Sequence, residues 1–168
     1  QEMNFNQSVS SVGNEILAGC TALQDLYINM LGANTTGNTV TGSTNFGFLF
    51  GKTGGTGLVE NTIQIDANTT EIRYIPADVT LHFIGSVIPS YAFAGVSSLK
   101  KVVLHEGVRE IGDYAFLDTT NLEEVRIPSS LEDCGIYVFK NSGLVTAYFG
   151  EGIETIYEGM FANCSNLT

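Results

Sequence analysis

The feature that most constrains this chain is a repeat with a period of roughly 23 residues. Phenylalanine recurs in this register at Phe93, Phe116, Phe139 and Phe161. Leucine recurs beside it in the same register at Leu99, Leu122, Leu144 and Leu167. A fixed period of this length is the signature of architectures in which successive copies stack and bury their apolar side chains against one another.

A short alternating run follows each of the first three leucines of the Leu column. It has the form L-x-x-Φ-x-Φ, where Φ is apolar, and it predicts strands at 102–104, 125–127 and 147–149. This spacing, repeated with the same period, indicates a leucine-rich solenoid. We therefore predict a mostly β member of the α/β class, a right-handed stack of about six coils with parallel strands. The four phenylalanines should form a buried aromatic ladder.

Two further apolar positions recur after each strand and are predicted to point inward. They are Val108, Leu131 and Ile153, followed three residues later by Ile111, Cys134 and Ile156.

The same register continues toward the N-terminus. Met3 and Phe5 fit a strand, Val9 and Val12 fit the two positions after it, and Leu17 falls in the Phe column. We predict a single solenoid over residues 1–168. Its parts are N-terminal coils at 1–39, a decorated coil at 40–84 and regular coils at 85–168.

The decorated coil carries a long insertion, predicted at 51–79. Phe50 is expected in its Phe column and Leu81 with Phe83 in its strand. The segment Ala33–Gly57 is rich in Gly, Thr and Asn, which favours loop. Thr62–Ile75 alternates in polarity around a turn-like Asp-Ala-Asn-Thr, with Ile63 and Ile65 before it and Ile72 and Tyr74 after it, and predicts a β-hairpin. The insertion is either a site of function or a brace for the stack, and both interpretations stay open.

Composition restricts the possible partners. Eighteen acidic and seven basic residues give a net charge of −11, which argues against nucleic acid and anionic membrane as partners. No apolar run reaches the roughly 18–20 residues of a membrane span.

No cofactor or metal is predicted. The cysteines Cys20, Cys134 and Cys164 form no C-x-x-C motif and no Cys/His spacing typical of zinc. Cys20 and Cys164 fall in the same column about five coils apart, beyond disulfide reach.

The sequence predicts no catalytic residues, and we expect a protein that is not an enzyme. There is no G-x-S-x-G elbow. The carboxylates lie at turns rather than in the inward pairs that glycoside hydrolysis needs. The two histidines, His82 and His105, fall in different outward columns and are predicted to be plain surface residues.

Outward strand positions form the predicted binding surface. One column contains Asp25, Thr80, Lys101, Glu124 and Thr146, and the next contains Tyr27, His82, Val103, Arg126 and Tyr148. Lys101 and Glu124 should pair across adjacent strands. Because Tyr and Arg are enriched at binding hot spots, the candidate partner-binding residues are Tyr27, His82, Lys101, Arg126 and Tyr148. The alternative is a set of solvated strand residues without a partner.

The segments "VREIGDYAF", "SVIPSYAF" and "FANCSNL" resemble the BspA-like (Treponema-type) leucine-rich repeat, whose consensus reads roughly I-G-x-x-A-F-x-x-C-x-x-L-x-x-I-x-I-P. Leu17 in place of the usual Phe and Cys134 in place of the usual Ile depart from this pattern, so less regular packing is expected in those two coils.

What the resemblance implies is a secreted or cell-surface protein that adheres to host proteins or other cells, extracellular-matrix glycoproteins among them. The alternative is a structural spacer in a larger surface protein. The family offers no shared catalytic or ligand-binding residues to carry over. Since the chain begins and ends inside a coil, it is expected to be part of a longer protein.

Overall fold

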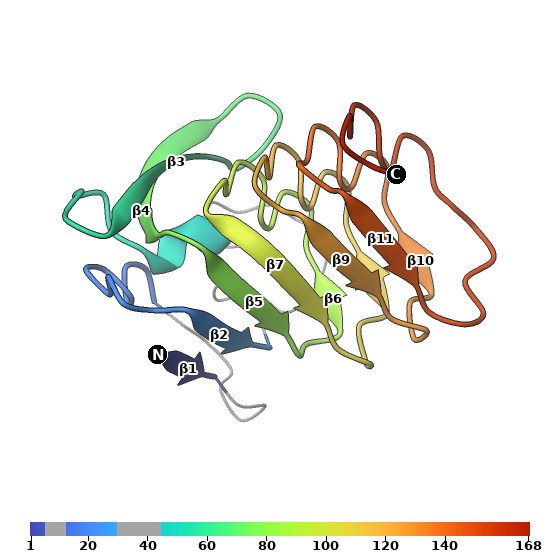
Figure 1. The fold of residues 1–168 in the computed structure, drawn as a ribbon, viewed down its shortest axis with the longest axis horizontal. Coiled ribbons are helices and arrows are strands. Elements are labelled where there is room, and N and C mark those ends of the chain that lie inside the picture. Colours follow the sequence, from blue (N-terminus) through green and yellow to red (C-terminus); the bar gives the residue numbers. More distant parts are fainter. Residues whose placement is uncertain (6–12, 30–44) are drawn as a thin grey trace.

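A computed structural model describes residues 1–5, 13–29 and 45–168. Its main feature is a six-stranded sheet in which every neighbouring pair of strands is parallel. In spatial order the strands are β1 (Glu2–Asn4), β2 (Asp25–Ile28), β5 (Val79–Phe83), β7 (Leu99–Leu104), β9 (Glu124–Ile127) and β11 (Thr146–Phe149). Each strand comes from a successive coil, as Figure 1 shows, so the predicted stack of parallel strands is confirmed. The predicted inward positions Val9 and Val12, and most of the predicted loop, lie outside the described residues.

A second parallel sheet covers the opposite side of the coils. It contains β6 (Val87–Ile88), β8 (Glu110–Ile111) and β10 (Asp133–Cys134), with β8 in the middle. No α-helix is present among the described residues, which contain one 3₁₀ turn, η1 (Phe46–Leu49). The coils therefore meet through backbone hydrogen bonds on two strand faces.

The phenylalanine ladder forms as predicted. Ring centroids of Phe93 and Phe116 are 4.8 Å apart, those of Phe116 and Phe139 5.0 Å, and those of Phe139 and Phe161 5.6 Å. Backbone hydrogen bonds hold the same turns together, because the Phe93 amide donates to Ala115 and the Phe116 amide to Val138. The stacked rings and these bonds repeat together in every regular coil.

A second column of tyrosines has an unusual backbone. Tyr91, Tyr114 and Tyr137 have φ angles of 57°, 57° and 55°, in the left-handed region. Their rings stack at centroid distances of 5.2 and 5.6 Å. Gly159 takes the same position in the last coil, with φ 59°. The recurring conformation tightens the turn that leads into each buried Phe.

Leu17 and Cys134, the two residues that depart from the repeat consensus, are packed inside the coils. The expectation that their coils pack less regularly was wrong. Cys134 pairs in register with Ile111 and is 4% exposed, and Leu17 is 2% exposed. Both side chains are apolar and fit the space that a larger residue occupies elsewhere.

A single strand, β5, lies between β2 and β7 and pairs with both, so the insertion falls within the one coil that leads from β2 to β5. The predicted hairpin is confirmed as antiparallel strands β3 (Leu58–Gln64) and β4 (Thr70–Pro76). The predicted end of the insertion at residue 79 needs correction. Val79 is fully buried and opens β5, where it pairs with Leu99.

Phe50 shares its predicted column with Phe46. Toward the preceding coil the Leu17 amide donates to Leu49, which places Phe50 in the Phe column. Toward the following coil the Phe46 amide donates to Ala92, which places Phe46 there instead. The 3₁₀ turn between them therefore shifts the register by one turn within a single coil.

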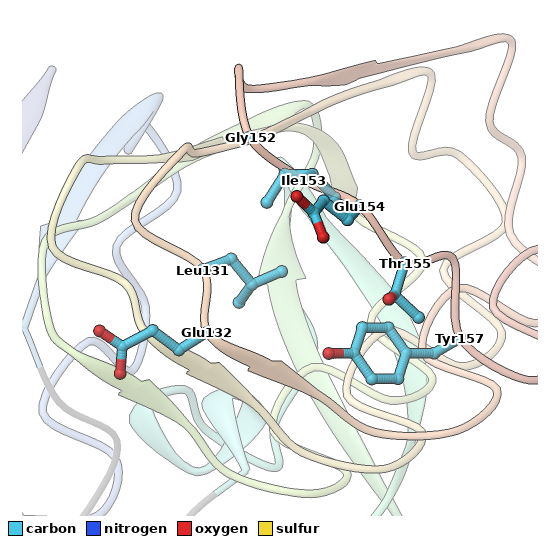
Figure 2. Close-up of a pocket in the computed structure, with 7 residues that line it drawn as sticks. All are labelled: Leu131, Glu132, Gly152, Ile153, Glu154, Thr155 and Tyr157. Atoms are coloured by element: carbon cyan, nitrogen blue, oxygen red, sulfur yellow. The ribbon is translucent and has the colours of Figure 1, made fainter.

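The last coil departs from the predicted inward positions at Phe149, which is 38% exposed, and most of all at Ile156. Ile156 is 60% exposed, whereas its equivalents Ile111 and Cys134 are 1% and 4% exposed. The segment around it forms no strand and turns away from β10, and this opens the shallow pocket of Figure 2 between Leu131 and the stretch from Gly152 to Tyr157. Within the described chain this coil has a neighbour on one side only, so nothing holds Ile156 inward.

Candidate functional site

The outward columns of the six-stranded sheet have the predicted register. Asp25 lies opposite Thr80, Thr80 opposite Lys101, and Lys101 opposite Glu124. In the next column Tyr27 lies opposite His82, and Arg126 lies between Val103 and Tyr148. All the candidate partner-binding residues therefore lie on one face, and the side chains form two groups.

The first group gathers on β2, β5 and the end of β7. The rings of Tyr27 and His82 stack with centroids 4.0 Å apart and an interplanar angle of 9°. His105 Nε2 lies 3.4 Å from His82 Nδ1, and His82 Nε2 lies 3.4 Å from Asp25 Oδ1. Both histidines were predicted to be plain surface residues, but in the structure they contact each other, and His82 also contacts Asp25. Their columns differ, but a histidine side chain is long enough to reach diagonally across neighbouring strands.

The first group is partly withdrawn from solvent. The His82 side chain is 16% exposed. Burial lowers the pKa of His105, and the neighbouring His82 lowers it further. The neutral form of the His105 imidazole is therefore favoured in the folded protein.

The second group lies on β7, β9 and β11. Arg126 Nε lies 3.1 Å from Glu124 Oε1, and Lys101 Nζ lies 4.0 Å from the same oxygen, so the predicted pair with Lys101 forms. The Arg126 guanidinium sits 4.2 Å from the centre of the Tyr148 ring. Tyr148 is 46% exposed, so this pair presents an aromatic ring and a cation together to solvent.

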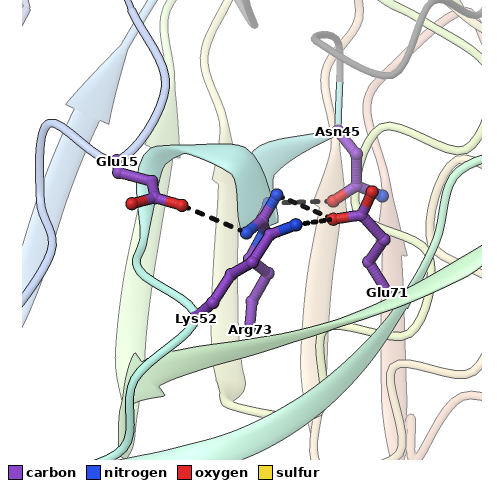
Figure 3. Close-up of polar contacts among 6 residues, drawn as sticks. Glu15, Asn45, Lys52, Glu71 and Arg73 are labelled. Atoms are coloured by element: carbon purple, nitrogen blue, oxygen red, sulfur yellow. Dashed lines mark hydrogen bonds and ion pairs between the residues drawn. The ribbon is translucent and has the colours of Figure 1, made fainter.

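The insertion contributes a buried charged residue that sequence reasoning missed. Arg73 on β4 is 2% exposed, its Nη2 lies 2.8 Å from Glu71, and its Nη1 lies 3.4 Å from Glu15 (Figure 3). Lys52 Nζ lies 3.1 Å from the same Glu71 carboxylate. The guanidinium also lies 4.7 Å from the centre of the Phe48 ring. This network joins the hairpin to η1 and to the first coils.

The inner face of β4 also differs from the alternation in the sequence. Ile63 and Ile65 are buried as that pattern suggests, but Ile72 is 47% exposed. Arg73 and Ile75 take the inner positions of β4 instead. The sequence signals this inner face only weakly. Arg73 and Ile75 are spaced two residues apart, as Ile72 and Tyr74 are, so the spacing alone does not show which pair points inward.

Asn61 fastens the hairpin to the regular coils. It is fully buried, its side-chain amide donates to Ser98 Oγ at 2.8 Å, and its side-chain oxygen accepts from the Ser98 amide at 2.8 Å. The Ser97 hydroxyl donates to the same oxygen at 3.1 Å. One face of the insertion is therefore fixed against the stack by these hydrogen bonds.

Other classes of site find little support in the part of the chain that the structure describes. Within residues 1–5, 13–29 and 45–168, no group of three His, Cys, Asp or Glu side chains is placed to hold a metal ion. All three cysteines are free. The residues that line the pocket of Figure 2 include Glu132, Glu154, Thr155 and Tyr157 but no basic side chain. None of the described helices could cross a membrane.

These features define a solenoid repeat protein with a buried ladder and one exposed parallel strand face. Residues 86–168 match the BspA type leucine rich repeat region in six copies.

Among solved structures, the chain is similar to a leucine-rich repeat protein from Eubacterium ventriosum, at 28% identity and a TM-score of 0.51. The similarity covers 56% of this chain and 27% of that protein, so this chain corresponds to only about a quarter of its length. No curated protein matches this chain. Repeats of this family form protein-interaction or structural modules that are generally not enzymes, and they are often found in surface or secreted proteins.

Proposed function

We propose that this protein is a non-enzymatic binding module of a secreted or cell-surface protein, which adheres to proteins of a host or of neighbouring cells. The observation that carries this proposal is the Arg126–Tyr148 pair, a cation on a half-exposed aromatic ring at the edge of a flat strand face. Arg and Tyr are the side chains most often found at interaction hot spots.

Charge supports the use of this face. Seven basic residues stand against eighteen acidic ones in the chain, yet Lys101 and Arg126 lie together here and share Glu124. This makes the strand face close to neutral on an otherwise acidic molecule. A protein partner would meet less electrostatic repulsion here than elsewhere on the surface.

The insertion supplies a second, smaller contact surface. Ile72, on the outer face of the hairpin, is 47% exposed, and the hydroxyl of Tyr74 on the same face donates a hydrogen bond to Glu60 Oε2. In this proposal the strand face provides the main contact and the hairpin an additional one.

The test is surface-plasmon binding of the protein to a panel of extracellular-matrix and plasma glycoproteins. The variant is Arg126→Ala with Tyr148→Ala, and the control is Arg109→Ala. Arg109 matches Arg126 closely, because their side chains are 60% and 58% exposed and each pairs with a glutamate, but Arg109 lies beside the second sheet.

We expect binding that the double variant loses and Arg109→Ala keeps. Binding that survives in the double variant but is lost in Ile72→Ser would move the contact to the hairpin. No binding to any glycoprotein by a folded protein would contradict the adhesion proposal and favour the structural spacer.

A further inference from the structure

The only two histidines of the chain meet on the strand face. His105 Nε2 and His82 Nδ1 are 3.4 Å apart. Two nitrogens bound to one zinc ion at 2.0–2.1 Å, with a tetrahedral angle between them, are about 3.3 Å apart. The separation of the two imidazole nitrogens thus matches a shared metal ion.

Asp25 favours one tautomer of the His82 ring. Its carboxylate lies 3.4 Å from Nε2, the nitrogen on the opposite side of the ring from His105. A carboxylate accepts hydrogen bonds, so it favours the proton on Nε2 and leaves the lone pair on Nδ1. Histidines that bind metals almost always donate their other ring N–H to such a partner.

Tyr27 restricts the His82 ring. The two rings are nearly parallel with centroids 4.0 Å apart, and the His82 side chain is only 16% exposed. A ring held between a stacked neighbour and a carboxylate loses little freedom when it binds an ion. The net charge of −11 further favours a cation at this surface.

We propose that His82 Nδ1 and His105 Nε2 bind a zinc ion on the strand face, with Asp25 as the positioning residue for His82. No third protein ligand is placed beside them within the described ranges, so water completes the coordination shell. The site is therefore open and binds more weakly than a structural zinc site with four protein ligands. It does not depend on the proposed adhesive function.

The first test is calorimetric titration of the folded protein with zinc ion alone, combined with long-range proton–nitrogen NMR of the two imidazoles. We expect one ion per chain, and a shift of His82 Nδ1 and His105 Nε2 with little change at the other ring nitrogens. If those two nitrogens do not shift at saturating zinc, the proposal is overturned and the pair is a histidine–histidine contact only.

Variants separate this site from other zinc-binding groups. His82→Gln and His105→Gln should each abolish the stoichiometric binding, and Asp25→Ala should weaken it about 10- to 100-fold. Asp78→Ala is the control, since Asp78 is an exposed aspartate that pairs with Lys100 and contacts neither histidine, and this variant should leave zinc affinity unchanged. Equal binding by a folded His82→Gln, His105→Gln double variant, which keeps all three cysteines, would also overturn the proposal.

Discussion

Phe46 and Phe50 lie four residues apart in the chain and occupy the same column of the solenoid. Their ring centroids are 5.2 Å apart, Phe46 packs against Phe93 at 5.4 Å, and both rings are fully buried. The aromatic ladder of the regular coils thus continues through the decorated coil, although the coil spacing is broken there by an insertion. The column of buried phenylalanines is therefore continuous, although the number of residues from one coil to the next differs.

Truncation within the ladder should be costly. Phe116 is fully buried and stacks on Phe93 and Phe139, so Phe116→Ala should lower the free energy of unfolding by about 3–5 kcal/mol. Phe161→Ala should cost less, because Phe161 is only partly buried. Urea unfolding followed by circular dichroism measures both variants. An equal decrease in the free energy of unfolding for Phe116→Ala and Phe161→Ala would contradict this dependence on burial.

Removal of the Asn61 side chain should release the hairpin. Asn61→Ala leaves the Ser98 amide without its side-chain acceptor in a buried position, at a cost of about 1–3 kcal/mol. Hydrogen exchange should become faster at residues 58–76 and stay unchanged in β9. Asn68→Ala, at the exposed tip of the hairpin, is the control and should change neither.

Gly95 tests how closely the hairpin approaches the coil. A Cβ at Gly95 would lie 2.0 Å from the Thr62 carbonyl oxygen, and its φ is 75°. Gly107 also has a positive φ, 116°, but nothing lies within 4 Å of its Cβ position. Both alanine variants carry backbone strain of about 1–3 kcal/mol, and Gly95→Ala should lose more because it also displaces β3. A thermal melt in which the two variants lose equal stability would contradict this close contact.

The buried thiol of Cys134 predicts a pH dependence. Burial, and then Asp133 and Asp113, raise the pKa of Cys134 from 9.0 to about 12. Because the pKa in the folded state is raised, the stabilisation is fully present below pH 9.0 and is lost as the pH rises toward 12. The free energy of unfolding should therefore fall more steeply above about pH 9 for the parent than for Cys134→Val. If the free energy of unfolding fell equally with pH in both proteins, the raised pKa of Cys134 would be contradicted.

The stack itself could be predicted from the sequence because each coil contacts the next through equivalent positions. A column that recurs once in every coil must lie beside its own copy, whatever the details of the turns. For this reason the register of Lys101 with Glu124 and of Arg126 with Tyr148 was predictable.

Contacts that do not repeat could not be predicted in the same way. Arg73 is buried because Glu15, 58 residues away, reaches it across a unique contact between the hairpin and the first coil. The His82–His105 contact depends on side-chain directions across a diagonal, which column positions alone do not give. Ile156 shares the column of Ile111, but its segment forms no strand and, among the described residues, its coil has a neighbour on one side only.

The shared columns also determine how such a protein can change length. Removal of one whole coil, from Leu99 through Asn121, would join Ser98 to Leu122 and bring β9 beside β5, with Phe139 next to Phe93 and Cys134 next to Ile88. The apolar columns on the two sides of the new junction would meet in the same register as between other coils. Unequal recombination between repeats of the gene can therefore lengthen or shorten the protein by whole coils while the apolar columns stay aligned. A change of any other length would misalign all the columns that follow it.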